Sequence, residues 1–134
     1  MAEAIEIEIV TPERLVIKDV AQEIQIPAKN GYIGVLPGHA PLITELSVGE
    51  IVYRSGGAVH RLACASGFAE VLPNKVTILT ETAERAAEID TQRAHVARTR
   101  AEERLQTAQT EADYERALNA LRRAEVRLQV AAGL

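Results

Sequence analysis

The chain has 134 residues, a formal net charge of −4 at pH 7, and 47% hydrophobic but only 3% aromatic residues. This length predicts one domain with an appendage. The scarcity of aromatic side chains and the slight acidity exclude nucleic acid as a main partner, because stacking platforms and a basic field are both missing. Apolar runs fall far short of the roughly 20 residues of a membrane helix. The glutamate-rich start is unlike a secretory or transit peptide, so we expect a cytosolic protein.

The composition changes at about residue 84. All five prolines and seven of the eight glycines lie in residues 1–84, whereas residues 85–134 contain one glycine and neither proline nor lysine. Residues 1–84 carry a net charge of −5, and residues 85–134, with nine arginines, carry +1. This break predicts a compact β-domain over 1–84 followed by a movable helical arm over 85–134.

Short strands are expected throughout the β-domain. In Ile5–Ile9, isoleucine alternates with glutamate, which is the period of a strand with one buried face. Turn signals rich in Pro, Gly and Asn separate the apolar runs at spacings of about ten residues, a pattern typical of an antiparallel β-sandwich or barrel. No pattern indicates a parallel sheet. Further strands are expected at 15–20, 23–26, 34–36, 50–54, 59–65, 68–72 and 76–80.

The sequence of the arm predicts two antiparallel helices. Asp90 is placed to cap the first helix, and the turn falls within 107–113, where Thr110 or Asp113 can cap the second. Ile89 is placed to pack on the first turn as a hydrophobic staple.

Each helix carries a narrow apolar stripe at i+3 and i+4 spacing. Because alanine buries little area, the hairpin is expected to be only marginally stable alone. The stripes are Ala94, Ala97, Ala101, Leu105 and Ala108 on the first helix, and Tyr114, Ala117, Leu118, Leu121, Ala124 and Leu128 on the second.

The sequence predicts neither catalysis nor a metal site. His39, His60 and His95 are scattered, with no pair at ligand spacing. The glycines of 31–34 lack the strand–loop–helix context of a phosphate-binding loop. Cys64 lies in an apolar run and is interpreted as a small core residue.

The arginines of the arm form two pairs. Arg93 and Arg100 are two turns apart and lie within about 20° on one helical face, while Arg123 and Arg127 are one turn apart on the second helix. If the hairpin closes, both pairs can converge near a hinge at Glu84, where four guanidiniums would suit a triphosphate.

A solvated helical face is the alternative interpretation of these arginines. Arg93 can pair with Asp90, Arg100 with Glu103, and the second pair lies near Glu125. On spacing alone this alternative is favoured.

Several segments resemble the epsilon subunit of F-type ATP synthases. Residues 31–42 read GYIGVLPGHAPL, residues 67–71 read GFAEV, residues 74–79 read NKVTIL, and the opening 9–12 reads IVTP. The resemblance spans the whole chain, including the sandwich-plus-hairpin layout. It implies a non-catalytic rotor subunit of the central stalk, which binds the gamma subunit and the ring of c subunits and couples proton-driven rotation to ATP synthesis at the beta subunits.

The resemblance also implies a location and a set of partner contacts. The subunit would lie on the cytoplasmic face of the bacterial plasma membrane, attached only through the complex. In the extended state, the arm would reach the alpha and beta subunits, and arginines of the second helix would block hydrolysis. Contacts with the ring and stalk are expected at Lys29, Asn30, Gly31, Tyr32, Gly38 and His39.

Residues 89–94 read IDTQRA, which matches the family's ATP-recognition motif. With this resemblance, ATP binding by these arginines is favoured over a solvated helical face. ATP is expected as a regulatory ligand, and no catalytic cofactor is expected. Arg93 also favours a bacterial source, because chloroplast members generally lack it. A purely structural coupling subunit and a free-standing nucleotide-binding protein remain alternatives. The implied ATP contacts are Glu84, Ile89, Asp90, Arg93, Ala94, Arg100, Arg123 and Arg127.

Overall fold

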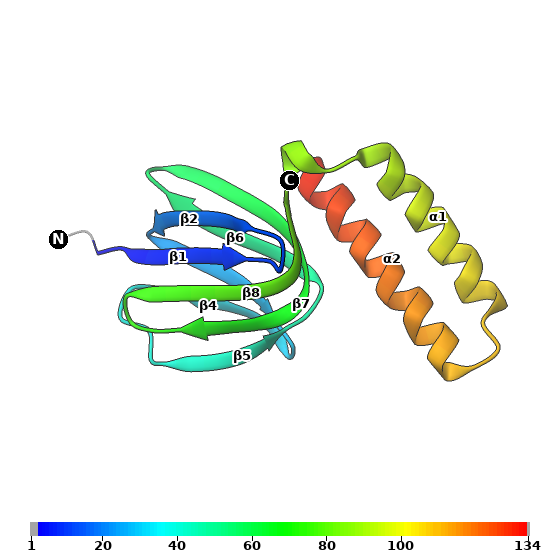
Figure 1. The fold of residues 1–134 in the computed structure, drawn as a ribbon, viewed down its shortest axis with the longest axis horizontal. Coiled ribbons are helices and arrows are strands. Elements are labelled where there is room, and N and C mark those ends of the chain that lie inside the picture. Colours follow the sequence, from blue (N-terminus) through cyan, green and yellow to red (C-terminus); the bar gives the residue numbers. More distant parts are fainter. Residues whose placement is uncertain (1–2, 134) are drawn as a thin grey trace.

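The structure is a computed structural model that describes residues 3–133. A β-sandwich forms one side of the molecule and a helical hairpin the other, with β8 leading from one to the other (Figure 1). The elements are β1 Ile5–Val10, β2 Leu15–Ala21, β3 Glu23–Ala28, β4 Gly31–Val35, β5 Leu42–Leu46, β6 Gly49–Ser55, β7 Ala58–Val71, β8 Lys75–Arg85, the 3-10 turn η1 Ala86–Glu88, α1 Thr91–Thr107 and α2 Glu111–Ala131. The expected fold class is confirmed.

The strands are hydrogen-bonded in the order β2-β1-β8-β7-β5-β3-β4, and β6 pairs with both β3 and β7. Antiparallel pairing is confirmed for every described pair except β1 with β8, which run parallel in register from Glu6↔Lys75 to Val10↔Leu79. The expectation of a purely antiparallel sheet is therefore corrected. A long connection permits parallel pairing, and most of the sandwich separates these two strands in sequence.

The core lies between the strands and is dominated by isoleucine and valine. The predicted alternation in β1 is confirmed, because Ile5, Ile7 and Ile9 are fully buried and Glu6 is exposed. Cys64 belongs to this core, as expected, and burial raises the pKa of its thiol to about 12. The thiol is therefore neutral and inert at physiological pH.

Two strand predictions are wrong. The sequence did not predict β5, because no alternation of apolar and polar residues marks this strand. In the structure its Leu42 and Ile43 are both exposed, Ile43 by 72%. The runs expected at 59–65 and 68–72 form one strand, β7, which continues through Ser66 and Gly67 at φ angles of 54° and 128°.

The helix caps are confirmed. The Asp90 carboxylate accepts a hydrogen bond from the Arg93 backbone N–H at 3.0 Å. The Thr110 hydroxyl accepts one from the Asp113 N–H at 3.1 Å, and α2 begins directly afterwards. Of the predicted stripes, Tyr114 is 50% exposed and lies outside the helix interface. The interface is centred on the buried residues Ala94, Ala101, Ala117 and Ala124.

Within residues 3–133, neither α1 nor α2 is long and apolar enough to cross a membrane.

Candidate functional site

The hairpin contacts the sandwich through the C-terminal end of α2. Val130 is fully buried against Ala63 of β7 and Ile89 of the linker, with Val126 and Ala131 partly buried beside them. In Figure 1, α2 lies next to the sandwich and α1 lies on its outer side, while the tip of the hairpin extends away. The apolar contact that holds the arm is therefore small.

Two ion pairs flank this apolar contact. Ala63 lies opposite Glu50 on β6 and opposite Glu84 on β8. Glu50, whose side chain is 7% exposed, pairs at 2.7 Å with Arg61 of the same sheet. Glu84 pairs at 2.5 Å with Arg127 of α2. The first pair belongs entirely to the sandwich, whereas the second joins the sandwich to the arm.

A hollow of about 560 Å³ opens where the sandwich, the linker and both helices meet. Its volume lies within the range of about 300–1,000 Å³ typical of small-molecule sites. The lining residues are Glu84 from β8, Glu88 from η1, Asp90 from the linker, Arg93, Ala94, Val96, Ala97 and Arg100 from α1, and Arg127 from α2.

Six of the eight residues expected to contact ATP line this hollow. Ile89 instead lies in the apolar cluster beneath the arm, and Arg123 lines other cavities. Arg123 is one helical turn from Arg127, about 6 Å nearer the tip of the hairpin. Glu88, which sequence reasoning missed, also lines the hollow, and its position one residue before the IDTQRA motif was the available signal.

The hollow combines three carboxylates with three guanidiniums, and several of these groups are already engaged. Glu84 binds Arg127, and one oxygen of Asp90 caps α1. The side-chain pairs Asp90–Arg93 and Glu103–Arg100, expected for a solvated face, are not among the ion pairs of residues 3–133. The guanidiniums of Arg93 and Arg100 are therefore available to an anionic ligand.

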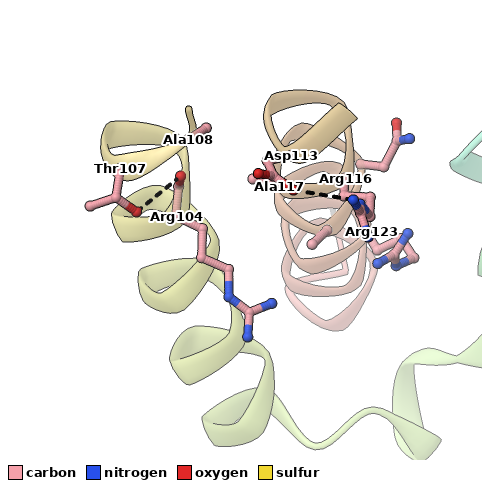
Figure 2. Close-up of a pocket in the computed structure, with 9 residues that line it drawn as sticks. Arg104, Thr107, Ala108, Asp113, Arg116, Ala117 and Arg123 are labelled. Carbon is pink, nitrogen blue, oxygen red and sulfur yellow. Dashed lines mark hydrogen bonds and ion pairs between the residues drawn. The ribbon is translucent and has the colours of Figure 1, made fainter. Parts of the chain in front are cut away.

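A second hollow of about 530 Å³ lies toward the tip of the hairpin (Figure 2). Arg104 extends from α1 along the space between the helices, while Arg116 and Arg123 project from α2. Arg116 is engaged by Asp113 at 3.1 Å. The first hollow, which six of the eight expected ATP contacts line, is the candidate anion site.

The expected ring and stalk contacts fall into two groups. Lys29 and Asn30 form the turn between β3 and β4, Gly31 and Tyr32 begin β4, and Lys29 pairs with Glu45 at 3.2 Å. The Tyr32 hydroxyl accepts a hydrogen bond from the Glu50 N–H at 3.1 Å, which fixes the turn against β6.

Gly38 and His39 lie in the loop after β4. The Gly38 N–H donates to the Pro73 carbonyl at 2.9 Å, and His39 Nδ1 lies 2.7 Å from the Ala40 carbonyl. This loop is therefore at the opposite end of β4 from the 29–32 turn. The two groups therefore flank β4, which lies at the edge of the strand order.

An eight-stranded sandwich followed by a docked two-helix arm, with an arginine-lined hollow at their junction, defines a two-domain class of protein. The beta-sandwich domain of the ATP synthase delta/epsilon chain matches residues 4–86, and the long alpha-helix domain of the same chain matches residues 87–132. The chain belongs to the ATP synthase delta/epsilon family, whose members are non-catalytic subunits of that complex.

Proteins named ATP synthase epsilon chain are similar over most of their length. The one from Koribacter versatilis is 67% identical over 111 residues, covering 83% of this chain and 78% of the relative. The one from Syntrophobacter fumaroxidans is 47% identical over 114 residues, covering 85% of each.

Solved structures have the same fold. A chain in the OSCP/F1/c-ring structure of the Euglena gracilis mitochondrial ATP synthase superposes with a TM-score of 0.82 at 26% identity, covering 98% of this chain and 82% of that one. A chain from the central stalk and c-ring of the Tetrahymena thermophila enzyme gives 0.62 at 11% identity, covering 95% and 96%, and is similar in fold alone.

Proposed function

We propose that this chain is a rotor subunit of the central stalk of a bacterial, proton-translocating F-type ATP synthase, on the cytoplasmic face of the membrane. It binds the gamma subunit and the c-ring and couples rotation to ATP synthesis. The family match over both domains supports this proposal, together with the similarity to a chain of the Euglena gracilis OSCP/F1/c-ring structure. The test is co-purification with gamma: a chain that does not bind gamma would contradict the assignment.

The ring contact is proposed for one end of the sandwich only, because the two candidate loops lie at opposite ends of β4. Lys29→Glu and His39→Glu reverse or add charge at one loop each. Loss of c-ring binding in one variant alone would identify the end that faces the ring, and unchanged binding in both would exclude these loops.

We further propose that the hollow at the junction binds ATP as a regulatory ligand. The phosphates would lie along Arg93 and Arg100, which are about 10 Å apart along α1, and Arg127 would contribute from α2. Carboxylates at the other side suit donors of the ribose or base. The members of this family are non-catalytic subunits, so the ligand would be sensed and not hydrolysed.

ATP would stabilise the docked arm. The buried Val130 and its neighbours supply a contact of only a few kcal/mol, since complete burial of a valine contributes about 1.5–3 kcal/mol. A ligand at a hundredfold excess over its Kd adds about 2.7 kcal/mol if the open state does not bind it. The two quantities are comparable, so ATP would shift the equilibrium strongly toward the docked arm, and its loss would release the arm toward alpha and beta.

Calorimetric titration of ATP into the isolated chain tests the site. Saturable binding that is lost in Arg93→Ala and Arg100→Ala but kept in Arg98→Ala would support it, because Arg98 lies on the same helix outside the hollow. No saturable binding up to millimolar ATP would overturn it. Loss of binding in Arg123→Ala would show that the hairpin tightens around the ligand.

A purely structural coupling subunit is the second candidate. The pair Arg127–Glu84 favours it, since this pair already satisfies two groups of the hollow without a ligand. Removal of residues 88–134 decides between the two functions. Unchanged ATP hydrolysis by the assembled complex would support a structural role, and faster hydrolysis would support an inhibitory arm.

A further inference from the structure

The 3-10 turn η1, which precedes the arm, is bound to the β1–β2 turn of the sandwich. Arg14, in the turn between β1 and β2, places its Nη2 atom 2.6 Å from Oε2 of Glu88. The other oxygen of Glu88, Oε1, accepts a hydrogen bond from the Arg85 N–H at 3.0 Å. Both carboxylate oxygens of Glu88 are therefore engaged, one by Arg85 at the end of β8 and the other by Arg14, which lies 74 positions earlier in the sequence.

The groups that hold Glu88 are themselves fixed to the sandwich. Two hydrogen bonds close the β1–β2 turn. The Thr11 N–H donates to the Arg14 carbonyl at 3.0 Å, and the Arg14 N–H donates to the Thr11 hydroxyl at 3.3 Å. The Arg85 guanidinium donates to the Val16 carbonyl at 2.8 Å, and its backbone lies opposite Leu62 in the β7–β8 ladder. Prior ordering of these partners reduces the entropy cost that usually makes a surface ion pair weak.

The contacts change character after Glu88. Ile89 and Asp90 are extended, with ψ angles of 124° and 98°, and α1 begins at Thr91. The side chain of Ile89 is buried in the cluster that it shares with Val130 of α2. The side chain of Ile89 is therefore held by apolar packing between arm and sandwich, whereas the Glu88 carboxylate of η1 is held by polar contacts with the sandwich.

We infer that Arg14, Arg85 and Glu88 clamp η1 to the sandwich and confine the pivot of the arm to Ile89 and Asp90. This inference rests on the proposed function only in that the arm must be able to undock. Arg14 is a positioning residue of the hinge, since it does not line the hollow.

The position of the pivot determines how the hollow comes apart. Glu84 and Glu88 stay with the sandwich, while Arg93, Arg100 and Arg127 leave together on the hairpin. Undocking would separate Glu84 and Glu88 from the guanidiniums, whereas Asp90, which caps α1, would stay beside Arg93. A ligand in the hollow would therefore bridge two bodies, one acidic and one basic.

Amide hydrogen exchange of the full chain tests the clamp without any nucleotide. We expect Arg14→Ala to speed exchange of the Arg85 and Ile89 amides about fivefold, as for loss of one well-fixed surface ion pair. Arg54→Ala removes an exposed pair with Glu23 elsewhere on the sandwich and should leave these amides unchanged. Equal exchange in Arg14→Ala and the parent chain would overturn the inference.

Spin-label distances test the pivot. In a Cys64→Ala background, one label pair joins Val59→Cys to Ala87→Cys on η1, and the other joins Val59→Cys to Gln106→Cys on the hairpin. Val130→Asp places a charge in the apolar contact to release the arm. We expect the second distance to broaden and the first to stay narrow, until Arg14→Ala is added and the first broadens as well.

Three results would contradict the inference: broadening of both distances while Arg14 is present, an unchanged first distance after Arg14→Ala, or an arm that stays docked in Val130→Asp. Because ATP is absent from these experiments, failure of the nucleotide proposal would leave their outcome unaffected.

Discussion

Arg127, near the end of α2, donates a hydrogen bond from Nε to Oε1 of Glu84 at the end of β8, across 43 positions of sequence. Both residues also line the hollow at the junction of arm and sandwich. Docking of the arm and the proposed binding of an anion therefore share Arg127. A ligand that takes Arg127 must replace the stabilisation that Glu84 provides.

Replacement of Arg127 by alanine should loosen the arm. Each side chain of the pair is 31% exposed, and loss of the cation leaves Glu84 half-buried without its partner. We expect docking to weaken by about 1 kcal/mol, measured as faster amide exchange at residues 126–131. The control is Arg122→Ala, an exposed arginine on the same helix. An equal effect in both variants would show that the pair does not hold the arm.

Gly67→Ala should be strongly destabilising. Gly67 has a φ of 128°, and an added Cβ would lie 2.0 Å from the Leu79 carbonyl oxygen. Backbone strain and displacement of the β7–β8 ladder together should lower the free energy of unfolding, measured by chemical denaturation, by more than about 3 kcal/mol. Gly56→Ala provides the comparison, because Gly56 also has a positive φ but faces open space. A loss no larger than that of Gly56→Ala would refute the close contact.

The helix interface of the hairpin should not tolerate a larger side chain at its centre. Ala101 is 2% exposed and Ala124 is 1% exposed. Ala101→Leu should overpack the interface and destabilise the hairpin by about 1–3 kcal/mol. The measurement is the thermal loss of helical circular dichroism, with Gln106→Leu at an exposed position as the control. Increased helix stability in Ala101→Leu would mean that the helices are not closely packed.

Acid should weaken the contact between β2 and β6, which includes the hydrogen bond from Tyr53 to Asp19. The Val20 N–H, at 2.8 Å, is the main cause that holds the pKa of the Asp19 carboxyl below its ordinary 3.8, with the Tyr53 hydroxyl, at 3.1 Å, also contributing. Because the folded-state pKa is lowered, the stabilisation is complete above pH 3.8 and is lost as the pH falls through the lowered value.

Asp19→Asn should therefore be less stable at neutral pH and lose less stability below pH 3.8 than the parent chain. Urea unfolding at several pH values measures this difference. Parallel stability curves for the two proteins would contradict the role of Asp19.

Local signals in the sequence predicted local structure well. The caps at Asp90 and Thr110 depend only on neighbouring residues, and the alternation in β1 reflects one buried face. The parallel pairing of β1 with β8 could not be predicted, because register across a long connection is decided by packing of the whole sandwich. β5 was missed for a related reason: its exposed Ile43 removes the period-two pattern.

The candidate site was predicted less completely than the fold. The resemblance named eight residues, of which six line the hollow, while Ile89 and Arg123 do not. Arg127 pairs with Glu84, and this pairing depends on how α2 packs on the sandwich, which the sequence does not specify. Glu88 was missed because its partner Arg14 is distant in sequence.

The distance between sandwich and arm in the assembled complex tests the central claim, that ATP stabilises the docked arm. Spin labels at Val59→Cys and Gln106→Cys, in a Cys64→Ala chain bound to gamma and the catalytic subunits, report this distance directly. We predict that ATP increases the population at the docked distance, and that Arg93→Ala removes the response while Arg98→Ala keeps it. A distance distribution that is the same with and without ATP would contradict the account.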